Sequence, residues 1–208
     1  MKKTLRVVAA ILVDRGRVFA TQRGYGPQKD GWEFPGGKIE AGEQPREALI
    51  RELREELAVQ IEAGELLGTV EYDYPDFHLS MDCFLARIRE GQPMLKEHEA
   101  ARWLGREELD ALGWLPADRS ILDRVKRALA LEEYRQAKEA IPPGRYRHFK
   151  GRDYEVLGVA RHSETEAPLV VYRPLYGEGG LWVRPAAMWN ELVERDGTRF
   201  QRFTKVPE

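Results

Sequence analysis

Three glutamates, Glu52, Glu55 and Glu56, stand three and four residues apart in the segment RELREELAV. Positions three and four apart are neighbours on a helix, so a helix here gathers all three carboxylates on one side, where like charges repel. Carboxylate oxygens are the ligands that Mg²⁺ and Mn²⁺ prefer, and both ions share their coordination shell with substrate phosphates. The spacing indicates a divalent-metal site. The ordinary alternative is a solvated acidic face that Arg51 and Arg54 neutralise.

A helix that begins near Pro45 must position these carboxylates. Proline suits the first helical turn, and the acidic side chains of Glu43 and Glu47 favour the positive end of the helix dipole. At about 100° per residue, four apolar side chains fall on one core-facing stripe. They are Leu49, Ile50, Leu53 and Leu57.

The segment before the helix, WEFPGGK over residues 32–38, combines a short apolar strand with a Pro-Gly-Gly loop. Glycines such as Gly36 and Gly37 let a backbone approach a ligand closely. A loop of this kind in front of an acidic helix favours a site for phosphate chemistry over a merely solvated surface.

Residues 37–59, GKIEAGEQPREALIRELREELAV, resemble the Nudix box, the loop-helix signature of hydrolases that cleave nucleoside diphosphates linked to another group. The lead-in WEFPGGKIE is similar to that of the MutT-like branch. One position departs from the pattern, because Ala58 stands where the family has glycine. If that residue is a left-handed helix cap, alanine costs about 1–2 kcal/mol there.

The resemblance implies an α/β fold, a Nudix α/β/α sandwich with a mixed sheet over residues 1–140, and a Mg²⁺-dependent hydrolase for which Mn²⁺ is a possible substitute. Glu52 stands at the place of the proposed general base. The implied metal ligands are the Gly36 carbonyl, Glu52, Glu55, Glu56 and Glu97, with Glu99 as the alternative to Glu97. The implied substrate-binding residues are Arg23, Lys38 and Asp118.

Asp118 has two readings. It precedes a long predicted helix that runs to about residue 141, where its carboxylate suits an N-cap. It also matches the place of a base-reading asparagine in the MutT-like branch, where a carboxylate would accept a hydrogen bond from an exocyclic amine such as cytosine N4. Before this helix, alternating patterns predict strands over residues 5–13, 18–22, 61–74 and 78–89.

Three functions are compatible with this pattern. The MutT-like lead-in favours a nucleoside triphosphate pyrophosphohydrolase that acts on a cytidine or an oxidised purine nucleotide. Pro75, sixteen residues past Val59, favours an ADP-ribose-type hydrolase, although a turn also explains a proline there. A nucleotide or nucleic-acid sensor without turnover is the third, and the intact glutamate set argues against it.

Residues 141–208 form a second predicted domain, which begins at the helix-breaking sequence IPPG. Short strand patterns predict a small β-rich, barrel-like fold, similar to a bacterial domain of unassigned function. From residue 144 onward it carries eleven Lys or Arg against nine Asp or Glu, a net charge of +2. Aromatics next to arginines, as in Tyr146-Arg147, suit either a nucleotide or nucleic-acid contact or simply a core.

Composition sets the remaining limits. The 208 residues are 42% hydrophobic and 33% charged, which is typical of a globular chain, and the net charge of −2 argues against wholesale nucleic-acid binding. The single cysteine, Cys83, lies in an apolar run and is expected to be buried. No segment has transmembrane length, so we expect a cytoplasmic protein without membrane contact.

Overall fold

The computed structural model describes residues 2–195 and 197–207. The described residues form two compact units that divide between Leu129 and Ala130. The helix α2 (Pro116–Ala140) contains this division. The domain boundary expected after residue 140 therefore stays a prediction. Within the described ranges, no helix is both long and apolar enough to cross a membrane.

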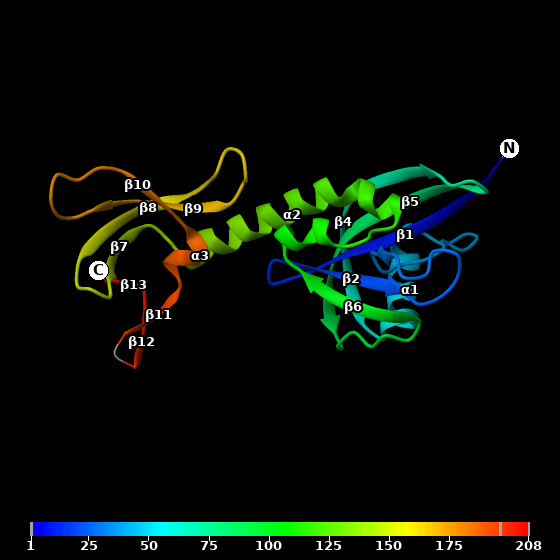
Figure 1. The fold of residues 1–208 in the computed structure, drawn as a ribbon, viewed down its shortest axis with the longest axis horizontal. Coiled ribbons are helices and arrows are strands. Elements are labelled where there is room, and N and C mark those ends of the chain that lie inside the picture. Colours follow the sequence, from blue (N-terminus) through cyan, green and yellow to red (C-terminus); the bar gives the residue numbers. More distant parts are fainter. Residues whose placement is uncertain (1, 196, 208) are drawn as a thin grey trace. The chain divides into compact units, whose positions relative to one another are not determined.

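The first unit is built on a six-stranded mixed sheet (Figure 1), as predicted. Its strand order is β3-β2-β1-β5-β4, and β6 also pairs with β2. Strands β1 and β5 are parallel, and the other pairs are antiparallel. The strands are β1 (Lys3–Asp14), β2 (Arg17–Arg23), β3 (Trp32–Glu33), β4 (Gln60–Asp73), β5 (Phe77–Glu90) and β6 (His98–Leu104).

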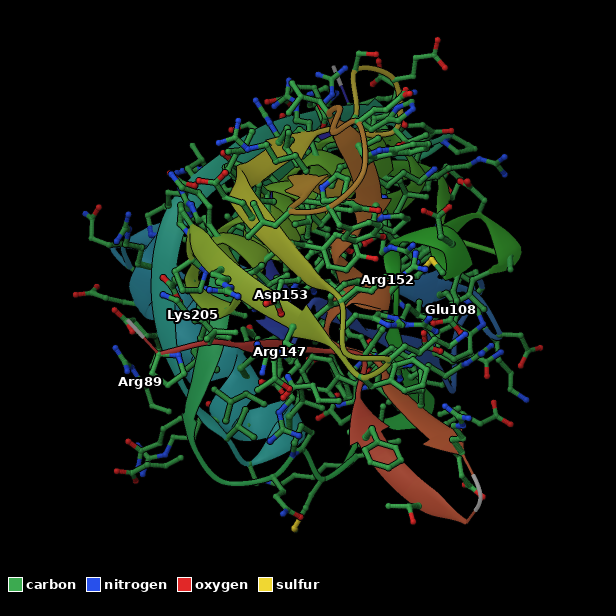
Figure 2. The ribbon with its side chains drawn as sticks, turned by 90° about the vertical axis from the view of Figure 1, so that its left-hand side faces the viewer. Arg89, Glu108, Arg147, Arg152, Asp153 and Lys205 are labelled. Carbon is green, nitrogen blue, oxygen red and sulfur yellow. The ribbon has the colours of Figure 1, made fainter. Side chains whose placement is uncertain are left out.

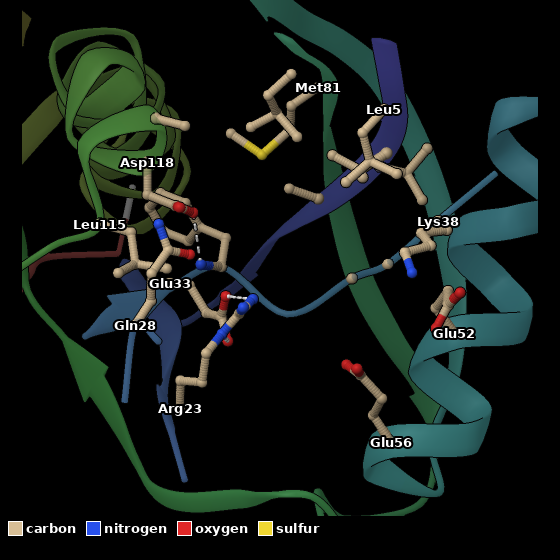
Figure 3. Close-up of a pocket in the computed structure, with 18 of the residues that line it drawn as sticks. Leu5, Arg23, Gln28, Glu33, Lys38, Glu52, Glu56, Met81, Leu115 and Asp118 are labelled. Atoms are coloured by element: carbon tan, nitrogen blue, oxygen red, sulfur yellow. Dashed lines mark hydrogen bonds and ion pairs between the residues drawn. The ribbon is translucent and has the colours of Figure 1, made fainter. Parts of the chain in front are cut away.

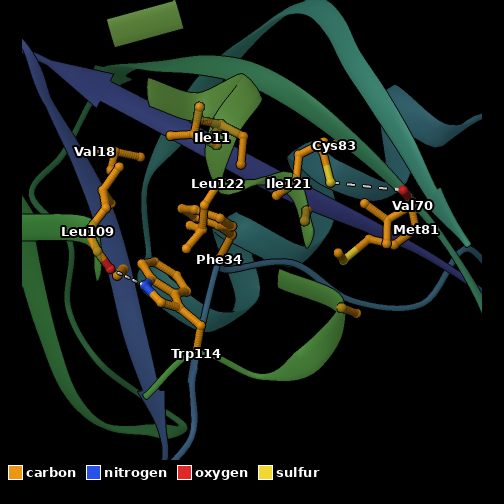
Figure 4. Packing of buried hydrophobic residues seen from close by; sticks show 14 of the residues in the cluster. Ile11, Val18, Phe34, Val70, Met81, Cys83, Leu109, Trp114, Ile121 and Leu122 are labelled. Atoms are coloured by element: carbon orange, nitrogen blue, oxygen red, sulfur yellow. Dashed lines mark hydrogen bonds between the residues drawn. The ribbon is translucent and has the colours of Figure 1, made fainter. Parts of the chain in front are cut away.

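Side chains of β1 alternate between two apolar clusters, which makes the unit three-layered. Val8, Ala10 and Leu12 pack with the buried side chains of α1 (Pro45–Leu57). Ala9 and Ile11 pack instead with α2 and the short 3-10 helix η1 (Arg106–Ala111). Figure 4 shows this second cluster, in which the indole N–H of Trp114 donates to the Leu109 carbonyl and Cys83 is buried as expected. The predicted α/β/α sandwich is confirmed.

Helix α1 begins at Pro45, as predicted, and Gln44 is its N-cap, whose backbone N–H donates to the Glu47 carboxylate at 3.2 Å. The predicted stripe was wrong at one position, because Ile50 is 42% exposed. Leu49 and Leu53 are fully buried, and Ala48 rather than Ile50 completes their face. The helix is rotated so that its acidic side turns partly inward, and Ile50 consequently turns outward.

The second unit contains a five-stranded antiparallel sheet in the order β10-β9-β8-β7-β13 and a separate hairpin of β11 and β12. We find no closed barrel in the described ranges. On β7 and β8, Arg147 donates to Asp153, and Figure 2 shows these two side chains together. The elements are β7 (Gly144–His148), β8 (Asp153–Arg161), β9 (Pro168–Pro174), β10 (Trp182–Pro185), α3 (Ala186–Trp189), β11 (Leu192–Arg195), β12 (Thr198–Gln201) and β13 (Phe203–Lys205).

Ala58 is the left-handed C-cap of α1, with φ 56° and ψ 32°, and its N–H donates to the Arg54 carbonyl at 3.2 Å. An L-residue with a side chain pays a steric cost in this conformation that glycine does not. We expect Ala58→Gly to raise the free energy of unfolding by about 1 kcal/mol. Urea titration measures the effect. Ala48→Gly, in the helix interior, is the matched control and should lower stability; a loss of stability in Ala58→Gly as well would contradict the assignment.

Candidate active site

A cavity of about 430 Å³ lies beside α1 in the first unit (Figure 3). Its lining brings together residues from β1, β2, β5, α1, α2 and the Pro-Gly-Gly loop. Seven of the eight predicted site residues line it, and Glu55 does not. The seven are Arg23, Gly36, Lys38, Glu52, Glu56, Glu97 and Asp118.

Helix geometry separates Glu56 from Glu55. At about 100° per residue, Glu56 lies roughly 20° around the helix from the buried Leu49, whereas Glu55 lies roughly 120° away. Glu56 and Glu52 therefore face the cavity (Figure 3), and the Glu55 side chain is 59% exposed. Glu55 instead accepts a hydrogen bond from Arg51 at 3.3 Å.

Arg51 fixes the loop to the helix. Its guanidinium makes two hydrogen bonds with the Glu43 carboxylate, at 2.9 and 3.0 Å. It also donates to the Lys38 carbonyl at 3.0 Å and to Glu52 at 2.9 Å. A paired, planar arginine of this kind holds both segments in one geometry.

The two loop glycines are required by close packing. A Cβ on Gly37 would lie 2.3 Å from the carboxyl carbon of Glu52. Gly36 has φ +155°, and a Cβ there would lie 2.1 Å from the Val8 carbonyl oxygen. Backbone hydrogen bonds between β1 and the loop, such as Val8 N–H to the Gly37 carbonyl at 2.8 Å, hold this approach.

The Glu56 carboxylate is buried without enough hydrogen bonds or positive charges to offset the cost of removing it from water. Its Oε2 atom has no hydrogen-bond partner among the described residues. Burial, together with the negative charges of Glu52, Glu33 and Glu97, raises the pKa of Glu56 to about 8, and a hydrogen bond from the Gly36 backbone opposes this rise. A charge buried in this way is costly unless a partner neutralises it.

These donors fit a hard divalent cation. Oxygen ligands from carboxylates and the Gly36 carbonyl are the type that Mg²⁺ takes, and the unpartnered oxygen of Glu56 supplies one of them. No three His, Cys, Asp or Glu side chains within residues 2–195 and 197–207 are already arranged to hold a metal. The fit therefore rests on the donor chemistry and on the buried, unpartnered oxygen of Glu56.

The ends of β2, β3 and β6 supply a second polar group of residues. Arg23 donates two hydrogen bonds to Glu33, at 3.0 and 2.5 Å, and Tyr25 donates to Glu97 at 3.2 Å. His98 is the next residue after Glu97, and its side chain is 6% exposed; its Nε2 atom lies 3.7 Å from Glu33. Glu99, the alternative to Glu97, is not in the cavity lining and lies 3.8 Å from Lys29.

Sequence reasoning missed Glu33 and His98 as cavity residues. His98 begins β6 and lines the cavity. For Glu33, a signal was present in the sequence, since a carboxylate between Trp32 and Phe34 interrupts an apolar strand. Glutamate is rarely buried unless it is paired, and Glu33 is paired with Arg23.

Asp118 is not the N-cap, because α2 already begins at Pro116. Its Oδ1 instead accepts a hydrogen bond from the backbone N–H of Phe34 at 2.9 Å, a contact between segments 84 positions apart. Burial raises the pKa of the Asp118 carboxyl to about 7, which the bond from Phe34 opposes and the charge of Glu33 reinforces. Asp118 thus joins α2 to the loop and faces the cavity (Figure 3).

Comparison with known proteins identifies this arrangement. The family model described as NUDIX domain matches residues 2–125, which is more than half of the chain. The chain belongs to the Nudix hydrolase family. A second model, described as a protein of unknown function (DUF1653), matches residues 144–205.

Two curated relatives of this Nudix chain come from Escherichia coli. The 8-oxo-dGTP diphosphatase is 34% identical over 128 residues, which cover 61% of this chain and 99% of that protein. The CTP pyrophosphohydrolase is 34% identical over 122 residues, which cover 58% of this chain and 90% of that protein. The MutT-like relatives confirm the branch inferred from the sequence.

Solved structures show the same fold. The solution structure of the E. coli ORF135 protein aligns with a TM-score of 0.55 and 32% identity, over 62% of this chain and 94% of that one. The crystal structure of a MutT Nudix hydrolase from Burkholderia pseudomallei gives a TM-score of 0.56 and 28% identity, over 60% and 99%. These matches cover the Nudix part alone.

The raised pKa of Asp118 makes stability depend on pH. A carboxyl whose pKa rises from 3.8 to about 7 on folding stabilises the fold fully below pH 3.8, and this contribution is lost as the pH rises to about 7. Between pH 5 and 8, we expect the free energy of unfolding of the wild type to fall relative to Asp118→Asn. Glu56 is present in both proteins, so its contribution to the pH dependence cancels in the difference between their free energies of unfolding.

Urea titrations at both pH values, without divalent ions, measure this difference. Asp14→Asn, at the exposed end of β1, controls for the removal of any carboxylate. A constant difference between wild type and Asp118→Asn across this range would show that the Asp118 carboxyl is already ionised at low pH.

Proposed function

We propose that the chain is a Mg²⁺-dependent nucleoside triphosphate pyrophosphohydrolase that acts on a cytidine or an oxidised purine nucleotide and releases a nucleoside monophosphate and pyrophosphate. The observation that carries this is the buried, unpartnered Glu56 oxygen in a cavity lined by Glu52, Glu97 and two cationic side chains. The printed activities of the relatives, 8-oxo-dGTP diphosphatase and CTP pyrophosphohydrolase, support the same reaction.

The proposed metal ligands are the Gly36 carbonyl and the carboxylates of Glu52, Glu56 and Glu97. The Nudix pattern implies Glu55 as a further ligand. In this proposal Glu55 binds the metal only after its hydrogen bond with Arg51 breaks. Held by these residues, Mg²⁺ would supply positive charge beside the phosphates and would lower the pKa of an attacking water. Glu52 takes the proton from that water in the proposed mechanism, and Arg51 orients its carboxylate.

Arg23 and Lys38 are the proposed phosphate contacts. The Arg23 side chain is 37% exposed and is held by Glu33, which fixes the plane of its guanidinium while leaving other donors available. A planar guanidinium matches the geometry of phosphate oxygens. Lys38 follows the two glycines and lines the same cavity as a point charge.

The apolar part of the cavity suits a nucleobase. Tyr74 and Phe77 stack at 4.8 Å between ring centroids, and Leu115 and Met81 complete the apolar lining. Asp118 is a polar group of this part of the lining, and we propose that it contacts the edge of the base. A pKa near 7 lets its carboxyl accept a hydrogen bond when ionised and donate one when neutral.

The nucleotide panel described below also tests two alternative functions, an ADP-ribose-type hydrolase and a sensor without turnover. Pro75 lies in the tight turn between β4 and β5, where Tyr74 N–H donates to the Phe77 carbonyl at 2.9 Å, so the turn already explains this proline. An ADP-ribose-type hydrolase would prefer a diphosphate-linked sugar, and a sensor would bind without product release. We also propose that the reaction takes place in the cytoplasm. The single cysteine, Cys83, is buried and forms no disulfide, and a reducing compartment suits such a chain.

The main test is a nucleotide panel with Mg²⁺. We expect pyrophosphate release from CTP, dCTP or 8-oxo-dGTP, and a loss of kcat of at least about a hundredfold in Glu56→Gln, because the amide keeps the volume but removes a ligand charge. Glu65→Gln, an exposed carboxylate on β4, is the matched control. Preferred cleavage of ADP-ribose, binding without release, or an unchanged kcat in Glu56→Gln would each contradict the proposal.

Asp118→Asn tests the base contact. The amide keeps an oxygen acceptor but adds an N–H₂ group, which suits a guanine-type O6 acceptor better than the cytosine amine. A direct base contact is worth roughly 1–3 kcal/mol, so kcat/KM for cytidine nucleotides should fall by about tenfold relative to 8-oxoguanine nucleotides. Measuring both substrates on both proteins decides this, and equal proportional changes would remove Asp118 from base recognition.

A further inference from the structure

Aromatic rings in the second unit fall into two groups. One group is core: Tyr146, Tyr172, Trp189 and Phe203 are at most 7% exposed and pack with Ala137 and Ile141 of the α2 end. This confirms that much of the aromatic pattern of residues 141–208 is structural. A second group of rings lies outside this buried core, so core packing alone does not explain why these residues are aromatic.

The second group forms a continuous line, which we call the aromatic strip: Tyr176, Tyr154, His148, Phe149 and Phe200. Successive ring centroids along it are 5.6, 6.4, 4.4 and 6.3 Å apart. Both ends are open to solvent, with Tyr176 41% and Phe200 40% exposed. The strip therefore offers stacking surface at two separate places.

Cations flank the strip along its length. The Arg152 guanidinium lies 4.7 Å from the Tyr176 ring centre, and the Lys150 ammonium lies 5.7 Å from the Phe149 ring centre. At the middle, Lys150, Arg184 and Arg202 together lower the pKa of His148, after the larger effect of burial. Only Arg202 of these three has a recorded carboxylate partner among the described residues, Glu191 at 2.6 Å.

Two buried donors next to the strip have no acceptor. The Nε atom of Arg184 and the indole Nε1 atom of Trp189 are buried without hydrogen-bond partners among the described residues. Both side chains contact the ring of Phe203, which also lies 4.8 Å from His148. Trp189 is fully buried in the core, so of these two side chains only Arg184, which is partly exposed, is available to an anion. Together with Lys150 and Arg202, which also act on His148, it forms a cationic cluster that attracts an anion.

We propose that the aromatic strip binds single-stranded nucleic acid. Bases stack on the exposed rings at its two ends, and the phosphates between them meet the cations around His148. Only an unpaired strand presents base faces to such rings, and stacking with a cationic groove is the usual chemistry of single-strand binding. Two separated stacking positions favour a strand over one nucleotide. The net charge of −2 argues against nonspecific nucleic-acid binding over the whole surface, but it does not exclude a local site of this kind.

The test uses the full chain in buffer without divalent ions, so that hydrolysis does not contribute. The probe is a fluorescent oligothymidylate or oligouridylate of about 12 nucleotides, within the usual site sizes. We expect binding that Tyr176→Ala and Phe200→Ala each weaken by about tenfold, since one stacked base is lost. Lys150→Gln and Arg152→Gln should each reduce the slope of log K against log salt by about 0.7.

Controls match each class of variant. Trp182→Ala removes a ring that is 60% exposed on β10, outside the strip, and Arg173→Gln removes an exposed cation that is paired with Glu155. Both should bind as the wild type does. Circular dichroism establishes that each variant is folded, and nucleotide hydrolysis with Mg²⁺ should be unchanged in all six.

Three results would overturn the proposal. They are no binding of the oligonucleotide at low salt, equal loss in the Trp182→Ala control, and binding of the oligonucleotide by Tyr176→Ala and Phe200→Ala as strong as that of the wild type. Because the binding assay contains no Mg²⁺ and the variants lie outside the Nudix cavity, these results are independent of whether the Nudix part hydrolyses nucleotides.

Discussion

The first unit depends on a carboxylate that is buried among other carboxylates. Glu56 lies on the inward face of α1 close enough to Glu52, Glu33 and Glu97 for their charges to raise its pKa, and one of its oxygens has no partner. Packing alone would not favour this placement, because a buried, unpaired charge is costly. In the function proposed above, a bound cation would neutralise this charge and offset the cost of burying it.

Much of the surrounding structure serves to hold that helix in place. Arg51 ties it to the loop through Glu43 and the Lys38 carbonyl, and the two glycines let the loop approach Glu52. On the other face of the sheet, Asp118 connects α2 to the loop through Phe34. Both helices are therefore fixed to the same short segment, which explains how the two outer layers meet at one cavity.

The second unit follows a different principle. Its core is aromatic, and its strands carry paired charges on one side, such as Arg147 with Asp153. Cations gather instead around His148, where rings outside the buried core are also concentrated. The binding proposed for these rings and cations is a different chemistry from the hydrolysis proposed for the first unit.

The sequence by itself predicted most of the elements, and seven of the eight residues that it proposed for the site line the cavity. The spacing of Glu52, Glu55 and Glu56, the Pro-Gly-Gly loop and the start of α1 at Pro45 are local features, because helix periodicity and turn residues act over a few positions. Tyr74 to Phe77 as a turn and Cys83 as a buried residue follow from similar short-range patterns.

Only the tertiary structure decided which side of the helix faces inward. The rotation of α1 buries Glu56 and exposes both Ile50 and Glu55, and it depends on packing against β1, 35 or more positions earlier in the chain. The role of Asp118 was decided in the same way, because its partner Phe34 is 84 positions away. Glu33 and His98 join the cavity through strand pairing with β2. Contacts of this range leave no periodic signal in one sequence, since they depend on how separate elements pack together.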